Sequence, residues 1–297
     1  MDSPRLGVLC AGLTTLDVVH LVDAVPPANL KVASRDFFMA AGGPAANAAV
    51  ASAHCGSPTT LVTALPPHPL TDVIVSDLTD CGVDVDIADH TLSGPPLTAA
   101  IMITASTGER AVVSPTSAAT DVPATPPQWD AASLVQDAGA VLIDGYHRHL
   151  SVPLACAAQE RGVPVVLDAG SYKHYTPELV KVTDIAVVSD DFRFPDSPGD
   201  PHDTLERLMA AGVSAAVVTR GHRPMLLQHG DDLPVEIPVT PVPVVDTLGA
   251  GDFLHGALAH RIATLGFAPE RLADDLAYAS QVVGRSLGSF GTRAWLG

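Results

Sequence analysis

Hydrophobic residues form short, continuous runs along the second half of the chain. The runs are rich in Val, Ile, Leu and Ala, and helical stretches separate several of them. Such runs are typical of strands buried on both faces, and their alternation with helices predicts a parallel sheet covered on both sides. The runs span 140–143, 164–167, 185–188 and 215–218, with helices at 150–161 and 203–211 and a turn at 178–182.

The first half follows a different pattern, in which turns join pairs of short β-type runs. We predict one hairpin from 18–22 and 31–39 and another from 97–103 and 110–113. Because neither hairpin has a helix of its own, we expect a small β-sheet lid, formed by about 16–41 and 91–115. The other predicted elements are a strand at 6–13, a helix at 44–54, a strand at 59–64 and a helix at 70–81.

Together these elements predict one α/β domain over residues 1–297, with three αβα layers around a mostly parallel, Rossmann-like sheet, and the lid attached. A stretch rich in Pro, Ala and Thr at 117–127 is the predicted linker from lid to core. Ligands of such sheets bind beyond the carboxyl ends of the strands. The residues found there are Asp17, Asp144, Asp168, 189–190, 219–221 and 246–247.

Composition excludes several classes of partner. The formal net charge of −17 argues against nucleic acids and anionic membranes, because both bind mainly through cationic groups. No apolar span is long enough to cross a membrane. The 4 cysteines show no C-x-x-C spacing and the first residues show no signal-peptide pattern, so we expect reduced thiols and a cytoplasmic protein.

The most informative motif is D-T-L-G-A-G-D at residues 246–252, between an apolar run at 242–245, predicted to be a strand, and a helix. Glycines let the main chain approach a ligand, and the first N–H groups of a helix have no internal partners, so a phosphate suits this turn. Asp252 places a negative charge at a turn that suits a phosphate. This placement is explained if the Asp252 carboxylate faces a substrate hydroxyl and not the phosphate itself. The alternative is an ordinary turn with a capping aspartate.

A second glycine motif, G-G-P-A-A-N at 42–47, precedes the predicted helix at 44–54. Asn47 lies one turn into that helix and can offer a donor and an acceptor to a hydroxyl. The alternatives are a plain glycine turn before a packing helix and, for Asp17, a solvated carboxylate at the end of a strand. No G-x-x-x-x-G-K-[ST] motif occurs, which excludes an ordinary P-loop enzyme.

The pair of motifs D-T-x-G-A-G-D and G-G-x-x-x-N resembles the ribokinase-like (PfkB) family of ATP-dependent sugar kinases, over nearly the whole chain. The resemblance implies transfer of the γ-phosphate of ATP to a sugar hydroxyl, with Asp252 as the catalytic base. The amides of Gly249, Ala250 and Gly251 would form the anion hole. The implied sugar contacts are Asp17, Gly42, Gly43 and Asn47, and the implied ATP contacts are Thr219, Gly221, Asp246, Thr247 and Gly288.

Within the family the chain is most similar to the ketohexokinase and sulfofructose kinase branch, on the segments at 42–47, 166–170, 187–192 and 253–258. This implies a ketose or a related acceptor. If the acceptor is sulfofructose-like, Lys31 and Arg148 are the candidates for its sulfonate. Two other functions stay open: a nucleoside kinase of the same fold, and a kinase-like binding protein with weak turnover.

The resemblance also implies Mg²⁺, allows for a monovalent cation such as K⁺, and implies a homodimer joined through the lid. Many relatives carry N-x-x-E after the strand at 185–188, where this chain has S-D-D-F. Asp190 is therefore the predicted Mg²⁺-organising residue, with Asp191 as its alternative and Asp168 as a second candidate. The apolar residues Phe37, Phe38 and Met39 would either join the dimer or cover the sugar.

Overall fold

The computed structural model describes residues 7–115, 129–197 and 199–297, so the predicted linker at 117–127 lies outside the described residues. A nine-stranded sheet forms the centre of the described chain, in the order β13-β12-β11-β10-β9-β8-β1-β4-β5. Neighbouring strands are parallel from β11 to β5, and β12 and β13 pair antiparallel at one edge. The strands are β1 (Gly7–Gly12), β4 (Thr59–Ala64), β5 (Val83–Asp89), β8 (Ala138–Ile143), β9 (Val165–Ala169), β10 (Ile185–Ser189), β11 (Ala215–Arg220), β12 (Arg223–His229) and β13 (Val235–Ile237).

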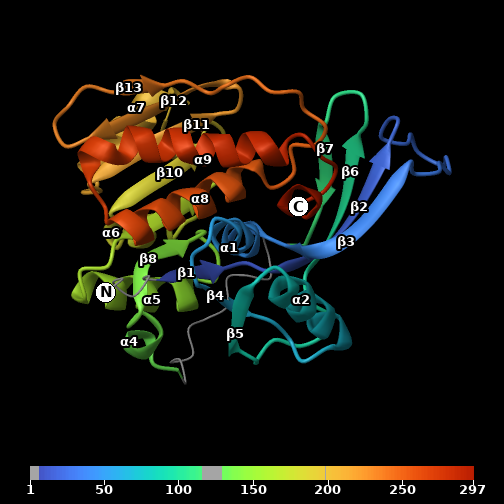
Figure 1. The fold of residues 1–297 in the computed structure, drawn as a ribbon, viewed down its shortest axis with the longest axis horizontal. Coiled ribbons are helices and arrows are strands. Elements are labelled where there is room, and N and C mark those ends of the chain that lie inside the picture. The colour runs from blue at the N-terminus through green and yellow to red at the C-terminus, as the bar shows by residue number, and fades with distance from the viewer. Residues whose placement is uncertain (1–6, 116–128, 198) are drawn as a thin grey trace.

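Helices cover both faces of this sheet, which gives the three predicted layers (Figure 1). One face packs against α1 (Pro44–His54), α2 (Pro69–Asp80), α8 (Ala250–Leu265) and α9 (Leu272–Ser286). The other face packs against α5 (Arg148–Glu160), α6 (Thr176–Lys181), α7 (Pro201–Ala210) and the short α4 (Ala131–Leu134). No helix in the described ranges combines the length and hydropathy needed to cross a bilayer.

A separate four-stranded sheet, called the small sheet below, projects from one end of the large one (Figure 1). Its order is β3-β2-β6-β7, with β2 (Thr15–Val22), β3 (Asp36–Gly42), β6 (Thr98–Thr104) and β7 (Arg110–Val113). Its inner face carries Val19, Ile101 and Ile103, which pack with Leu248 and Phe290 of the core. The small sheet therefore lies against the turn that carries the D-T-L-G-A-G-D motif.

Most predicted elements are present, and four details of the prediction were wrong. The run at 242–245 is not a strand, because Pro241 and Pro243 have no N–H to donate to a ladder. Residues 31–35 lie before β3 and not in it. Asp17 lies inside β2, two residues after its start. The segment at 178–182 belongs largely to α6 and is not a turn. The sequence analysis also did not predict β5, β12, β13, α4 or α9.

Helices α1 and α8 pack closely against each other. Three contacts follow the same order along both helices: Asn47 with Asp252, Ala48 with Gly256, and Ser57, just beyond α1, with His260. The two helices therefore lie side by side with their N-termini at the same end. A Cβ atom at position 256 would lie 2.0 Å from the carbonyl oxygen of Ala48, so only glycine fits there.

We predict that Gly256→Ala destabilises the fold by about 1–3 kcal/mol, because the added methyl group forces α1 and α8 apart. The matched control is Gly284→Ala in α9, where the nearest atom would be 3.5 Å from the new Cβ. This control should gain about 0.5–1 kcal/mol from helix propensity. Denaturant midpoints measure both effects, and equal midpoints for the two variants would contradict the prediction.

Candidate active site

The D-T-L-G-A-G-D segment forms a tight turn that ends in the N-terminus of α8. Gly249 has φ +75°, and a Cβ atom there would lie 2.9 Å from the Phe253 ring. This left-handed conformation favours glycine. The main chain beyond it opens directly into the first turn of α8, where N–H groups have no helical partners. The turn therefore has the geometry of an anion site at a helix N-terminus.

The first aspartate of the motif holds this turn in place. Asp246 is buried, and its Oδ1 and Oδ2 accept the N–H groups of Leu248 (2.8 Å) and Gly291 (2.9 Å). The Thr247 hydroxyl donates to the carbonyl of Gly108, between β6 and β7 (3.0 Å). Both residues are predicted ATP contacts. Asp246 thus shapes the turn, and Thr247 connects it to the small sheet.

The last aspartate of the motif faces a different helix. Asn47 Nδ2 donates to Asp252 Oδ2 at 2.8 Å, which joins the first turns of α1 and α8. Asn47 Oδ1 is buried and accepts no hydrogen bond in the described structure. Because a buried acceptor without a partner is costly, this oxygen is suited to a donor from a ligand, such as a hydroxyl.

The predicted sugar contacts meet at the end of the small sheet. Asp17 is 4% exposed, and its Oδ1 accepts the hydroxyl of Thr15 at 2.7 Å. A Cβ atom at position 42 would lie 2.0 Å from Asp17 Oδ2, and one at position 43 would lie 2.5 Å from the Leu13 carbonyl. Gly42 therefore makes room for the Asp17 carboxylate, and Gly43 allows the close approach to Leu13.

Electrostatics links Asp17 to the motif. Burial raises the pKa of Asp17 to about 6, and the nearby charge of Asp252 also raises it, while the Thr15 hydroxyl and the Arg293 charge lower it. Two carboxylates that influence each other in this way share one environment. The structure thus brings Asp17, Gly42, Gly43, Asn47 and Asp252 together, although they are up to 235 positions apart, from Asp17 to Asp252 (252 − 17).

Asp144, at the end of β8, supports this region from below. Its carboxylate accepts N–H groups of Leu13 (2.8 Å), Ala45 (3.0 Å) and Tyr146 (2.9 Å), and burial raises its pKa to about 6. It therefore ties the loop after β1 to the start of α1. These three hydrogen bonds indicate a structural role for Asp144.

A cavity of about 770 Å³ adjoins the motif, within the size range of small-molecule sites. Residues of α9 and of the strand ends form its walls together with the turn. Its lining includes the predicted residues Asp168, Thr219, Gly221, Thr247, Gly249, Ala250, Gly251 and Asp252, and also Leu287. Gly288 is the next residue along the chain but does not line the cavity.

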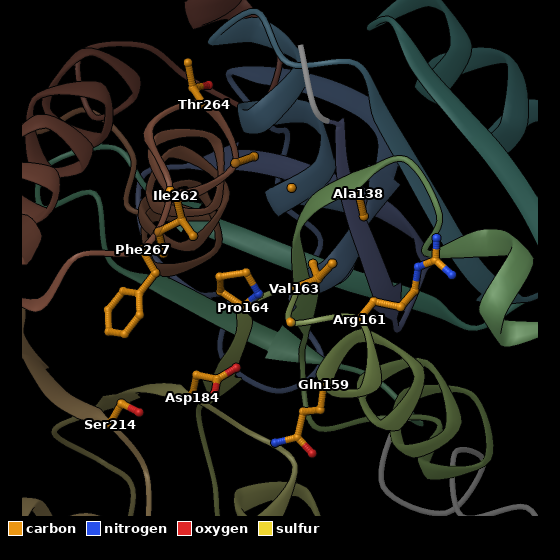
Figure 2. Close-up of a pocket in the computed structure, with 14 residues that line it drawn as sticks. Ala138, Gln159, Arg161, Val163, Pro164, Asp184, Ser214, Ile262, Thr264 and Phe267 are labelled. Atoms are coloured by element: carbon orange, nitrogen blue, oxygen red, sulfur yellow. The ribbon is translucent and has the colours of Figure 1, made fainter. Parts of the chain in front are cut away.

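A second hollow, of about 820 Å³, lies at the N-terminal ends of the strands, opposite the end that carries the motif (Figure 2). Figure 2 shows Pro164, Asp184 and Phe267 around it. Asp184 accepts the N–H of Val165 at 2.8 Å, so this carboxylate is used within the fold. None of the predicted site residues lines this hollow.

The metal candidates separate in the structure. Asp168 and Asp191 line the cavity beside Asp252, whereas the Asp190 carboxylate pairs with Arg223. Asp168 Oδ2 lies 3.3 Å from His255 Nδ1. Burial raises the pKa of Asp168, and the neighbouring His255 opposes this rise. Among the described residues no group of three or more His, Cys, Asp or Glu side chains forms a preformed metal cluster.

The structure gives the environment of the two cations expected to meet a sulfonate. Lys31 is exposed between β2 and β3, and Arg148 Nη1 pairs with Glu178 Oε1 at 3.0 Å. The sequence analysis instead missed Lys173, whose Nζ lies 4.0 Å from the centre of the Tyr146 ring. Burial lowers the pKa of Lys173, and the charges of Asp144 and Asp168 oppose this. Its position in the loop after β9 could have identified it, since the chain has few lysines.

Two more residues near the site escaped the sequence analysis. The two ring nitrogens of His255 lie within hydrogen-bonding distance of main-chain carbonyl oxygens, Nδ1 of Gly251 (2.7 Å) and Nε2 of Val187 (3.1 Å), and so His255 connects α8 to β10. Arg293 follows the last helix and contacts the small sheet near Gly42. Spacing identifies neither residue, because each acts through a partner that is distant in sequence.

Comparison with known proteins agrees with this fold. The chain is 26% identical over 273 residues to a ribokinase of Arabidopsis thaliana, an alignment covering 87% of this chain and 71% of that protein. Among solved structures, a putative ribokinase from Agrobacterium tumefaciens superposes with a TM-score of 0.82 at 23% identity, covering 96% of this chain and 92% of that one.

Two further structures share the fold. Arabidopsis thaliana ribokinase, complexed with ribose and ATP, superposes with a TM-score of 0.76 at 22% identity, with coverage of 97% and 94%. Adenosine kinase from Sinorhizobium meliloti gives 0.77 at 19% identity, with coverage of 97% and 96%. These likenesses do not single out the ketohexokinase branch, which stays a prediction.

The family model described as pfkB family carbohydrate kinase matches residues 6–295. Fold, motifs and this match agree, and the chain belongs to the pfkB family of carbohydrate kinases, phosphotransferases that act on an alcohol group.

Proposed function

We propose that this protein transfers the γ-phosphate of ATP to a hydroxyl of a small, neutral sugar. The observation that carries the proposal is the contact of Asp252 with Asn47, because it joins the anion-binding turn to the hydroxyl-binding residues. Asp252 is the proposed base at this junction. The Arabidopsis thaliana ribokinase complexed with ribose and ATP shares the fold, which supports a sugar and ATP as substrates here.

The donor would lie in the 770 Å³ cavity, with its terminal phosphate at the N-terminus of α8. The N–H groups of Gly249, Ala250 and Gly251 are the proposed anion hole, since they sit at the positive end of the helix. Thr219 and Gly221 line the same cavity from the end of β11 and the following turn. We assign them, with Thr247 and the region of Gly288, to the nucleotide.

The acceptor would lie between Asp17, Asn47 and Asp252, against Gly42 and Gly43. Asp17 and Asn47 Oδ1 accept hydrogen bonds from hydroxyls and orient the ring. The Asp252 carboxylate accepts the proton of the reacting sugar hydroxyl. At the same time the oxygen of that hydroxyl bonds to the γ-phosphorus of ATP, and the bond between the γ-phosphorus and ADP breaks. The inner face of the small sheet would exclude water from this step.

The residues present also suit Mg²⁺. This ion needs only one or two carboxylates, because waters and phosphate oxygens complete its shell. Asp168 and Asp191 offer such carboxylates in the cavity wall, whereas Asp190 is paired with Arg223. Bound there, the ion would neutralise charge on the phosphates. A monovalent cation such as K⁺ stays an expectation from the family.

A neutral acceptor fits the charges of the site better than a sulfonated one. Asp17 and Asp252 face the proposed acceptor, while Lys31 is exposed and Arg148 is paired with Glu178. Carboxylates bind hydroxyls but repel an anion. Lys173, the further cation near the site, faces the charges of Asp144 and Asp168. We therefore rank ketoses and aldoses above sulfofructose as acceptors, and we include nucleosides in the test because an adenosine kinase shares the fold.

We also propose a homodimer joined through the outer face of the small sheet. In its registers Met39 and Ala100 flank Val18, and Phe37 and Met102 flank His20. Phe37 is 50% exposed and Met39 48% exposed. A sheet face with exposed apolar side chains of this kind suits contact with a second copy.

Substitution of Asp252 tests its role as the catalytic base. Asp252→Asn should lower kcat by about 10²–10⁴-fold, because the amide cannot accept the hydroxyl proton, while ATP binding changes little. ADP release is measured with ketoses, aldoses, sulfofructose and nucleosides. Unchanged turnover in the variant would refute the role of Asp252, and wild-type protein inactive on every acceptor would favour a binding protein.

The proposed role of Asp17 predicts that sugar phosphorylation depends on pH. Because burial raises the pKa of Asp17 to about 6, this side chain is ionised at neutral pH and becomes protonated as the pH falls through about 6. Protonation removes a hydroxyl acceptor, so kcat/KM for the sugar should fall over that range. In Asp17→Asn this part of the profile should vanish, and any remaining decline reports other buried groups such as Asp144. An identical profile in both proteins would contradict the assignment.

Substitution of Met39 tests the proposed homodimer. Met39→Asp should convert the dimer to a monomer in sedimentation velocity, because it places a charge in the proposed apolar interface. Leu233→Asp is the control, since Leu233 is 85% exposed in the segment before β13, away from the small sheet. A monomeric wild type, or a Met39→Asp dimer of unchanged strength, would refute the lid-to-lid dimer.

A further inference from the structure

Strand β3 forms an edge of the small sheet, with β2 as its one neighbour in the strand order. Edge strands leave main-chain groups without partners in the sheet. At Ala41, one residue before Gly42, both main-chain groups are bonded from outside the sheet. The N–H donates to Asp77 Oδ2 (2.9 Å), and the carbonyl accepts from Arg293 Nη2 (2.7 Å).

The two side chains also bind each other. Arg293 Nη2 lies 2.8 Å and Nε 3.2 Å from Asp77 Oδ2. The Asp77 side chain is 25% exposed and that of Arg293 17%, so the pair is largely shielded from water. Asp77 comes from α2 and Arg293 from the last segment of the chain. The pair therefore replaces a neighbouring strand at this single position, with one acceptor and one donor.

The surrounding residues hold Arg293 in place. The Trp295 ring packs between Phe253 of α8 (4.9 Å) and His54 at the end of α1 (4.7 Å). Phe290 meets Phe38 of β3 edge-to-face at 5.2 Å. The C-terminal segment thus packs against α1 and α8 through Trp295 and contacts the small sheet through Phe290.

We propose that Arg293 and Asp77 are positioning residues for the acceptor: by binding both main-chain groups of Ala41, they hold Gly42 and Asp17 in the arrangement that receives the sugar. This role rests on the proposed function. Neither residue touches the reacting atoms. Their effect passes through Ala41 to Gly42, whose missing side chain leaves the space that Asp17 fills.

Charge adds to this geometric effect. Arg293 is the cation whose field stabilises the ionised Asp17, and Asp252 opposes it. Loss of Arg293 would therefore disturb Asp17 in two ways, by freeing the end of β3 and by removing a favourable charge. The nucleotide cavity lacks both Asp77 and Arg293 in its lining, so ATP should be affected little.

The experiment compares Arg293→Gln, Asp77→Ala and Arg293→Lys with the wild type. Because misplacing a substrate group by about 1 Å can cost up to about 100-fold, we expect the KM of the acceptor to rise about 10- to 100-fold in the first two variants. The KM of ATP should stay within about twofold. Arg293→Lys keeps a donor for the Ala41 carbonyl and should recover part of the loss. Hydrogen exchange of the peptide containing Ala41 should accelerate in the first two variants.

The matched controls are Arg207→Gln and Asp203→Ala, which break another Arg–Asp pair, within α7 (2.9 Å). They should leave both KM values and the Ala41 exchange unchanged. Equal losses for acceptor and ATP, or protected exchange at Ala41 in Arg293→Gln, would overturn the proposal. If the wild type phosphorylates no acceptor in the panel, the proposed function fails, and the exchange measurement still decides whether the pair holds Ala41.

Discussion

The close contact between α1 and α8 is the constraint on which the rest of the site depends. Each helix begins at a glycine turn, and Gly256 lets α8 approach the main chain of α1 at Ala48. This approach places Asn47 against Asp252 and brings two helix N-termini to one edge of the sheet. The proposed anion site and the proposed hydroxyl site are neighbours because these two helices pack closely.

Aspartates perform two different tasks around this contact. Asp144 and Asp246 are buried and accept main-chain N–H groups, so they shape the loops that surround the site. Asp17 and Asp252 are the two aspartates proposed to face the acceptor, and their charges influence each other. An aspartate near the site is therefore compatible with a structural or a chemical task, and its hydrogen-bond partners decide between the two.

Local patterns predicted much of the fold. The runs at 140–143, 164–167, 185–188 and 215–218 correspond to β8, β9, β10 and β11, because strands buried on both faces need continuous apolar side chains. The glycine motifs identified both helix N-termini, since their positive φ angles favour one residue type. The run at 242–245 misled because apolar content alone ignores the missing N–H groups of its prolines.

The sequence by itself determined the family, the type of reaction and the glycine turns, because these depend on motifs whose residues are neighbours in the chain. Only the tertiary structure decided which charges meet. It paired Asp190 with Arg223 and Arg148 with Glu178, and it brought Arg293 to Asp77 across 216 positions. Such partners are chosen by the packing of whole helices and strands, and no local pattern records that packing.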